Sequence, residues 1–277
     1  RAVVEKIRSV TDTPVTHVVN THWHDDHTNG NYVYRQAFPE AQIIAHRATL
    51  GALRDGWAVM EEQRREAYAG VDLERLQRAA SDPDALQADT AIAYSVYAGY
   101  VVALRPELPT LELVYPDTVF DDTLVLEYDN RRVELLWPGA GNTDGDVVVW
   151  LPRERMLITG DLLVAPIPFA FDSPVSDWIV TLEQLAGMDA DVFIPGHGAP
   201  QHDDRYLGSV TELLRATTDA VRKARETGVG FDELEAAVDL GDFRSRFAGS
   251  DPQRLWAWHS YFVSPGLKIA WASLVFP

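Results

Sequence analysis

The sequence predicts a mixed α/β protein, because strand-like and helix-like patterns alternate along the chain. Apolar residues on one helical face predict a helix over residues 1–9, and the apolar run Val15–Asn20 predicts a buried strand. The pattern then repeats, with a helix over Thr28–Phe38 that Pro39 ends and a strand over Ala41–Ala45. These elements place the chain in the α/β (α+β) class.

Residues 47–105 differ from this pattern, because they are rich in Ala, Glu, Arg and Leu and carry helical periodicity. Asp82-Pro83 predicts a helix start, and a long helix follows over Ala85–Leu104. We expect a single domain over residues 1–277 with residues 47–105 as a helical insertion. This insertion is interpreted either as a lid over the mouth of an active site or as an extra packing layer that does not contact substrate.

The remaining two thirds of the chain predict further strands and helices in order. Asp129-Asn130 predicts the turn of a hairpin, and Ser176 is a candidate helix cap. The expected strands are Leu124–Tyr128, Arg132–Trp137, Val147–Leu151, Met156–Thr159 and Val192–Ile194, and the expected helices are Ser176–Met188, 203–226 and 231–238. Asn142 and Asp161 are then expected on loops after strands, where a rigid sheet positions functional groups.

The hexapeptide His22-Trp23-His24-Asp25-Asp26-His27 carries three imidazoles and two carboxylates directly after an apolar run. His22 and His24 are two residues apart, so on extended backbone they project to the same side. Imidazole and carboxylate are the ligands that zinc and similar divalent metals prefer. The hexapeptide therefore predicts a metal site.

The hexapeptide and three later motifs together resemble the metallo-β-lactamase-fold hydrolases. His22-x-His24-x-Asp26-His27 is similar to the signature of that family. The later motifs follow in the family's order as Gly139-Ala-Gly-Asn142-Thr143-Asp-Gly145-Asp146, Thr159-Gly160-Asp161 and Pro195-Gly196-His197-Gly198. The resemblance covers about residues 15–200 and implies a four-layer αβ/βα sandwich with a two-metal site at one edge.

The resemblance also implies the ligands of each metal. The first site takes His22, His24 and a third His, and the second takes Asp26, His27 and His197. Asp161 bridges the two metals. The family normally has several strands before this point, so a leader and an N-terminal β segment could both precede Arg1.

Position 142 departs from the family pattern, because Asn142 stands where the third His of the first site is expected. An amide oxygen is a weaker zinc ligand than an imidazole. Three interpretations are open: Asn142 is a poor ligand of a weak first site, water or Asp144 takes its place, or the protein holds one metal with altered or lost activity. Asp146 is a candidate for a residue that does not bind the metal itself but orients one of the metal ligands.

The expected chemistry is hydrolysis by a metal-bound hydroxide, since metals lower the pKa of coordinated water to near 7. Asp26 and Asp161 are the candidate catalytic residues, and zinc is the expected metal, one or two ions, with manganese or iron as alternatives. Small acyl substrates, namely esters, lactones and thioesters, rank first, β-lactams next and phosphodiesters lower. The alternatives are a weakly active or inactive metal- or ligand-binding protein, because of Asn142, and an iron-dependent oxidation.

Aromatic residues near the motifs suggest a substrate with an apolar portion. The candidate substrate contacts are Trp23, Trp57, Phe169, Phe171 and Trp178. His46 is expected to be a packed residue rather than a ligand.

Composition limits the classes of partner, metal ligand and cellular location that this chain can have. The net charge of −18 disfavours nucleic acid as substrate or partner, and the absence of Cys excludes disulfides and Cys-bound zinc. No apolar run is long enough to predict a membrane span. We expect a soluble protein, either cytoplasmic or exported behind a leader, that acts on a small molecule; its oligomeric state is not predicted.

Overall fold

The computed structural model describes residues 1–55, 66, 68–80 and 88–274, which form two compact units. The larger unit comprises Val19–Trp23, Ile44–Thr49 and Thr118–Pro277. The smaller unit comprises Arg1–Val18, His24–Ile43 and Leu50–Asp117. The fold is mixed α/β, as the sequence predicts.

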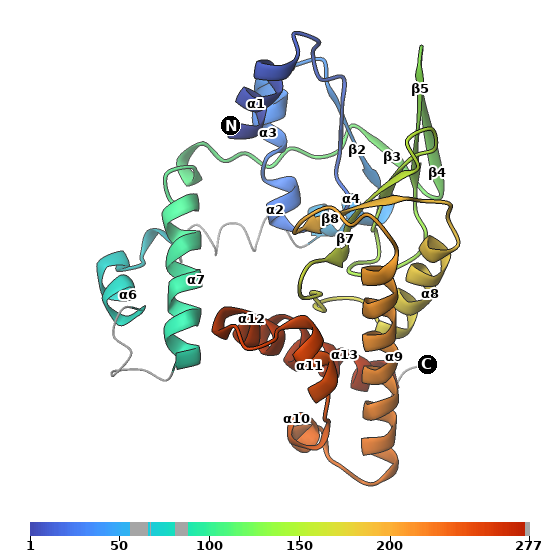
Figure 1. Cartoon of the computed structure of the whole chain (residues 1–277). Helices are drawn as coiled ribbons and strands as arrows, with labels where there is room; N and C mark the ends of the chain where they lie inside the picture. Colours follow the sequence, from blue (N-terminus) through green and yellow to red (C-terminus); the bar gives the residue numbers. More distant parts are fainter. Residues whose placement is uncertain (56–65, 67, 81–87, 275–277) are drawn as a thin grey trace. The chain divides into compact units, whose positions relative to one another are not determined.

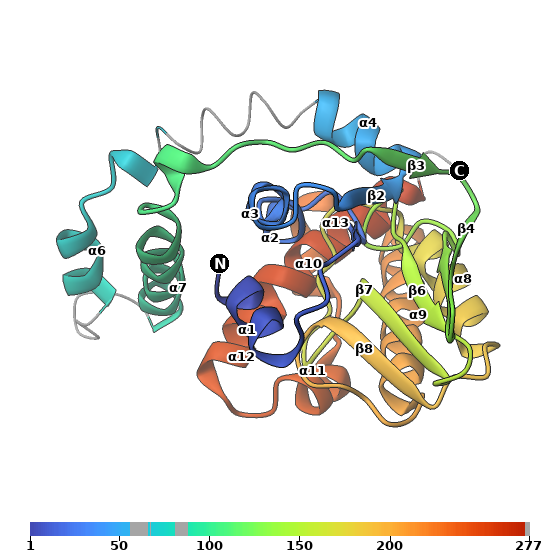
Figure 2. The same ribbon diagram turned by 90° about the horizontal axis from the view of Figure 1, so that it is seen from above.

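The smaller unit is mostly helical. Glu107 ties its segments together, since its carboxylate accepts hydrogen bonds from Arg1 Nε at 3.1 Å and from the Tyr32 hydroxyl at 3.0 Å. In both views α6 lies beside α7 (Figures 1 and 2). Its helices are α1 (Ala2–Val10), α2 (Asp25–Thr28), α3 (Asn31–Ala37), most of α4 (Arg47–Asp55), α6 (Leu73–Ala80), α7 (Ala88–Leu104) and the 3₁₀ turn η1 (Leu108–Thr110).

A three-stranded sheet has the order β1-β2-β3, formed by β1 (His17–Val19), β2 (Gln42–His46) and β3 (Thr118–Phe120). Strands β2 and β3 are parallel, with Ile44 opposite Thr118 and His46 opposite Phe120. Buried Ile44 and Phe120 pack with Leu135 and Val147 in a small apolar cluster of the larger unit. This cluster joins the end of β2 to the five-stranded sheet.

The five-stranded sheet of the larger unit has the order β4-β5-β6-β7-β8. The strands are β4 (Thr123–Tyr128), β5 (Arg131–Leu136), β6 (Val148–Leu151), β7 (Met156–Val164) and β8 (Val192–His197). Tyr128 pairs with Arg131, so Asp129-Asn130 forms the two-residue hairpin turn that the sequence predicts. The first four strands are antiparallel, whereas β7 and β8 are parallel.

Long helices cover one face of this sheet, and Figure 2 shows α9 lying along it. The reason is the apolar stripe of each helix, for example Leu182 on α8 and Leu213 on α9, which is fully buried against the strands. Besides α8 (Val175–Ala186) and α9 (Arg205–Glu226), the larger unit contains the helices α10 (Leu234–Ala237), α11 (Gly241–Phe247), α12 (Pro252–Ala257) and α13 (Ser264–Ser273), with the 3₁₀ turn η2 (Phe231–Glu233) and the π-helical η3 (Trp258–Val263).

Several expected details differ in the structure. Asp161 lies within β7 rather than on a loop after a strand, because β7 continues past Thr159 with register irregularities on either side of Gly160. Ser176 does not cap α8; the N-cap is Pro174, and the Ser176 hydroxyl donates to Asp177 instead. The expected helix start at Asp82-Pro83 lies outside the described residues.

Candidate metal centre

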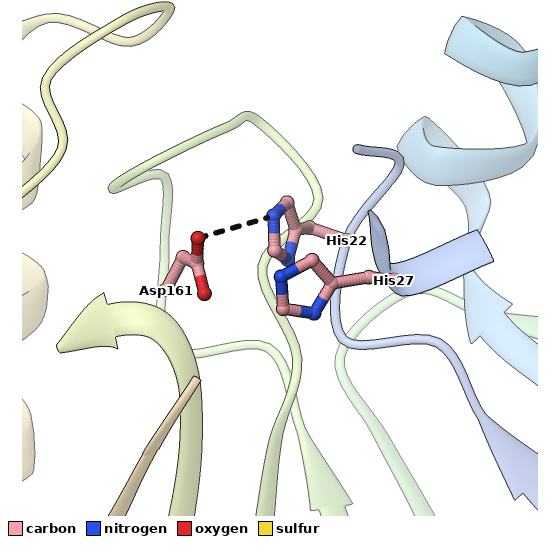
Figure 3. Close-up of side chains that lie close together, drawn as sticks. All are labelled: His22, His27 and Asp161. Carbon is pink, nitrogen blue, oxygen red and sulfur yellow. Dashed lines mark ion pairs between the residues drawn. The ribbon is translucent and has the colours of Figure 1, made fainter. Parts of the chain in front are cut away.

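Three of the predicted ligands meet in the larger unit. The Asp161 Oδ2 atom lies 3.8 Å from His22 Nε2 and 3.6 Å from His197 Nε2. Figure 3 shows His22 and Asp161 facing each other. These separations are too long for hydrogen bonds, but two ligands that each lie about 2.0–2.2 Å from one zinc ion are about 3–4 Å apart. The donor set and its spacing therefore fit a divalent metal.

The position of His22 depends on a close approach between two backbone segments. Gly160 has a positive φ of 53°, and a Cβ atom there would lie 2.7 Å from Thr21 Cβ. Glycine at 160 therefore lets Thr21 pack against β7. The Thr21 hydroxyl lies 3.1 Å from His22 Nδ1, which leaves Nε2 directed at Asp161. His22 itself is fully buried.

Asp161 needs a second glycine, on the neighbouring strand β8. A Cβ atom at Gly196 would lie 1.9 Å from Asp161 Oδ1 and 2.9 Å from the carbonyl carbon of Gly160. Any side chain at 196 would therefore occupy the space of the carboxylate. His197 follows at the end of β8, where the amide of Ala165 donates to its carbonyl at 3.0 Å.

Asn142 lies on the predicted loop and is 1% exposed. Its Nδ2 donates to the carbonyl oxygen of Phe169 at 2.8 Å, which fixes the orientation of the amide because a carbonyl accepts only from the nitrogen. The Oδ1 atom is buried and has no hydrogen-bond partner among the described residues. A buried amide oxygen without a partner is uncommon and calls for a cation or a water molecule beside it.

Asp146 is a buried carboxyl close to this loop. Its Oδ2 accepts from the amide of Thr143 at 2.6 Å, so it shapes the loop that carries Asn142. Burial raises the pKa of Asp146 well above its usual range, and the neighbouring charge of Asp161 raises it further.

The smaller unit holds the other half of the hexapeptide. His24 is the N-cap of the short helix α2, and its carbonyl accepts from the His27 amide at 3.1 Å and the Thr28 hydroxyl at 2.9 Å. Within this helix His27 Nε2 lies 3.4 Å from Asp26 Oδ2. Burial, and then the charges of Asp26 and Asp25, raise the pKa of Tyr100 on α7, so part of the predicted helical insertion lies close to the ligand motif.

An aromatic wall borders His197. Phe169 lies 5.6 Å from the His197 ring and 4.8 Å from the Tyr261 ring, measured between ring centroids. A pocket of about 430 Å³ opens here, lined by Val164, Ala165, Pro166, Ile167, Phe169, His197, Asp251, Gln253, Arg254, Ala257 and Tyr261.

Some of the predicted substrate residues lie at this aromatic wall, and others do not. Phe169 lines the pocket, and Phe171 packs on Phe169 and Tyr261 at 5.8 Å each without lining it. The prediction that Trp178 contacts substrate is wrong, because its side chain is 1% exposed in the core and donates to the Leu162 carbonyl. Trp23 is half-buried and does not line the pocket, and Trp57 lies outside the described residues.

Sequence reasoning missed Thr21, Tyr261 and Arg254. Thr21 directly precedes His22, so a hydroxyl next to a ligand was the available signal. Tyr261 and Arg254 follow the last motif by many residues, and no local pattern connects them to Phe169.

Comparison with known families agrees with this geometry. The family model of the metallo-beta-lactamase superfamily matches residues 2–197, which is well over half of the chain. The chain belongs to this superfamily. The fold of this superfamily holds metal ions, which agrees with the candidate ligands His22, Asp161 and His197.

Individual relatives of this superfamily member differ in activity. The chain is 25% identical over 266 residues to a linear primary-alkylsulfatase of Pseudomonas sp. (strain ATCC 19151), covering 87% of this chain and 46% of that enzyme. It is 30% identical over 121 residues to a type 2 metallo-beta-lactamase of Bacteroides fragilis, covering 42% of this chain and 45% of that enzyme. The chain thus spans less than half the length of these relatives.

A solved structure supports the fold. The metallo-beta-lactamase from Pontibacter korlensis superposes with a TM-score of 0.53 at 19% identity, covering 77% of this chain and 75% of that one. Among residues 1–55, 66, 68–80 and 88–274, no helix is long and apolar enough to cross a membrane.

Proposed function

We propose that this protein is a zinc-dependent hydrolase that cleaves an ester-like bond in a small molecule with an apolar portion. The observation that carries the proposal is that Asp161 Oδ2 lies within 4 Å of both His22 Nε2, at 3.8 Å, and His197 Nε2, at 3.6 Å, with His197 also lining an aromatic pocket. His197 is thus both a candidate metal ligand and part of the lining of the aromatic pocket.

The complete ligand set is part of this proposal. His22, His24 and Asn142 would hold one ion, and Asp26, His27 and His197 the other, with Asp161 shared. The Oδ1 of Asn142 has no hydrogen-bond partner within the described parts of the chain, which supports its assignment as a weak oxygen ligand.

A bound divalent ion lowers the pKa of water and polarises the substrate oxygen. His197 lines the pocket with Asp161 Oδ2 3.6 Å from its Nε2, and Phe169 and Tyr261 supply aromatic surface next to His197. Carboxylic esters, lactones and thioesters are the leading substrates, followed by β-lactams. Asp26 and Asp161 are the proposed catalytic residues.

A sulfate ester is a second candidate. The alkylsulfatase relative aligns with 87% of this chain, against 42% for the β-lactamase of Bacteroides fragilis, and its name states that it acts on linear primary alkyl sulfates. An alkyl chain would suit the apolar side of the pocket.

The testing experiment combines elemental analysis with a substrate panel. Freshly purified protein should contain about two zinc ions per chain, and it should hydrolyse at least one of four substrates. The panel is a 4-nitrophenyl alkanoate, a γ-lactone, a chromogenic cephalosporin and a primary alkyl sulfate. Metal-replete protein that hydrolyses none of them would overturn the proposal in favour of a binding protein, and iron in place of zinc would favour oxidation chemistry.

Asn142 variants separate an impaired hydrolase from a binding protein. Asn142→His should raise zinc affinity and the hydrolysis rate together, because an imidazole is the better ligand. Asn142→Leu should lower the zinc content. A gain of zinc without any turnover in the His variant would identify a metal-binding protein that lacks a productive site.

A further inference from the structure

The pocket beside His197 has a wall that the superfamily match does not include. The family model ends at residue 197, yet Asp251, Arg254 and Tyr261 line the pocket from α12 and η3. Two hydrogen bonds anchor the loop 165–171: the Phe169 carbonyl accepts from Asn142, and the Ala170 amide donates to the Tyr261 carbonyl of this wall at 2.9 Å. The C-terminal helices therefore supply a pocket wall that lies beyond the residues matched by the family model.

This wall is apolar on one side and carries a positive charge on the other. Ile167, Phe169 and Tyr261 supply the apolar surface, whereas the Arg254 side chain is exposed at α12. Within the described part of the chain the Arg254 guanidinium has no ion-pair partner.

The nearby carboxylate does not neutralise Arg254. Asp251 Oδ1 accepts the backbone amide of Arg254 at 2.9 Å and so serves as the cap of α12. The guanidinium keeps its five donors for a ligand, in the planar arrangement that matches carboxylate or sulfonate oxygens. The chain has a net charge of −18, so acidic partners are plentiful. An arginine in the pocket that forms no ion pair within the described residues is therefore unusual, and an anionic ligand would explain it.

We propose that Arg254 determines specificity by binding an anionic group of the substrate whose apolar part packs on Ile167, Phe169 and Tyr261. The substrate class is an ester that carries an apolar chain and, away from the bond that is cleaved, a negative charge. This inference rests on the proposed function, because His197 marks the end of the pocket at which cleavage occurs.

Binding is tested without catalysis, using octane-1-sulfonate and the neutral 1-octanol on the zinc-loaded protein by titration calorimetry. Octane-1-sulfonate should bind the wild type more tightly than 1-octanol does. Arg254→Gln should weaken sulfonate binding about tenfold, the loss expected for one charge-assisted hydrogen bond, and leave 1-octanol binding within about twofold. Arg244→Gln is the matched control and should change neither, because Arg244 is an exposed arginine on α11 that does not line the pocket.

Unchanged sulfonate affinity in Arg254→Gln would overturn the inference, since the anion would then bind elsewhere, for example at the metal. Equal weakening of both probes would also overturn it, because that result indicates a damaged pocket rather than a lost charge contact.

Kinetics separate this inference from the proposed function. Arg254→Glu should raise KM for the monoester of 4-nitrophenol with adipic acid, which carries a free carboxylate, while KM for neutral 4-nitrophenyl hexanoate stays the same. If the wild type hydrolyses neither ester, the ester-hydrolase proposal fails for these substrates, whereas the calorimetric result still decides the role of Arg254.

Discussion

At the scale of single residues, glycines determine how closely the backbone approaches the candidate ligands. Gly160 admits Thr21, which orients His22, and Gly196 leaves room for the Asp161 carboxylate. A Cβ atom at either glycine would clash with a neighbouring residue, and the need for glycine can be tested by substitution.

Gly196→Ala should abolish or strongly reduce metal binding, because its Cβ would lie 1.9 Å from Asp161 Oδ1 and displace that carboxylate. Zinc per chain, measured by elemental analysis, checks this. Gly208→Ala on α9 is the control, since nothing lies within 4 Å of its Cβ and alanine favours helix. Full zinc content in the Gly196→Ala protein would contradict a ligand role for Asp161.

His46 illustrates a histidine that packs, as the sequence predicts. Its Nε2 lies 2.8 Å from the Asp121 carbonyl, its Nδ1 accepts from the Ala48 amide at 3.2 Å, and its ring stacks on Trp137 at 5.1 Å. The carbonyl requires a proton on Nε2, so the neutral tautomer satisfies both nitrogens. Burial lowers the pKa of His46 below 6.5.

The lowered pKa of His46 predicts a pH dependence of stability. The unfolded chain takes up the proton first as pH falls below about 6.5, so the free energy of unfolding should decrease from that pH until the folded pKa is passed. Urea unfolding of metal-free protein between about pH 7 and pH 5 measures this. His46→Gln should show a shallower decrease than the wild type, whereas the exposed His202→Gln should follow the wild type.

At the scale of elements, the short helix α12 sets the position of the pocket wall. Pro252 occupies its first turn, and Asp251 caps it by accepting from the Arg254 amide. The α9 helix offers a comparison, because its N-cap Asp204 makes no side-chain cap hydrogen bond.

Asp251→Ala should lower the free energy of unfolding by about 1 kcal/mol, since it removes both a cap hydrogen bond and a favourable charge at the helix start. Asp204→Ala should cost less, because it removes only the charge effect. Urea unfolding of the two variants measures the difference, and equal losses would show that the cap hydrogen bond contributes nothing.

At the scale of the whole molecule, metal binding should couple to stability. The candidate ligands come from distant parts of the sequence, with His22 before β2 and Asp161 and His197 on β7 and β8. The unfolded chain does not hold such ligands together, so the metal binds mainly the folded state.

Removing the metal with a chelator should therefore lower Tm, and adding zinc back should restore it. A zinc concentration roughly 100-fold above Kd adds about 2.7 kcal/mol to the free energy of unfolding. Differential scanning calorimetry of chelated and zinc-reconstituted protein measures the shift. An unchanged Tm would argue against a metal held by residues of the folded core.

The sequence by itself determined the class of fold, the hairpin turn at Asp129-Asn130, and the motifs that carry the candidate ligands, because local periodicity, turn chemistry and ligand spacing are properties of short segments. The strand position of Asp161 and the failure of Ser176 as a cap depend on neighbours that the local pattern does not contain.

Only the tertiary structure decided that Asp161 lies close to both His22 and His197, that the Asn142 amide is fixed by Phe169, and that Arg254 and Tyr261 contribute to the pocket wall. The physical reason is that these contacts join segments far apart in the chain, and their distances follow from sheet register, close glycine contacts and helix packing. Composition and spacing along the sequence do not encode those distances locally.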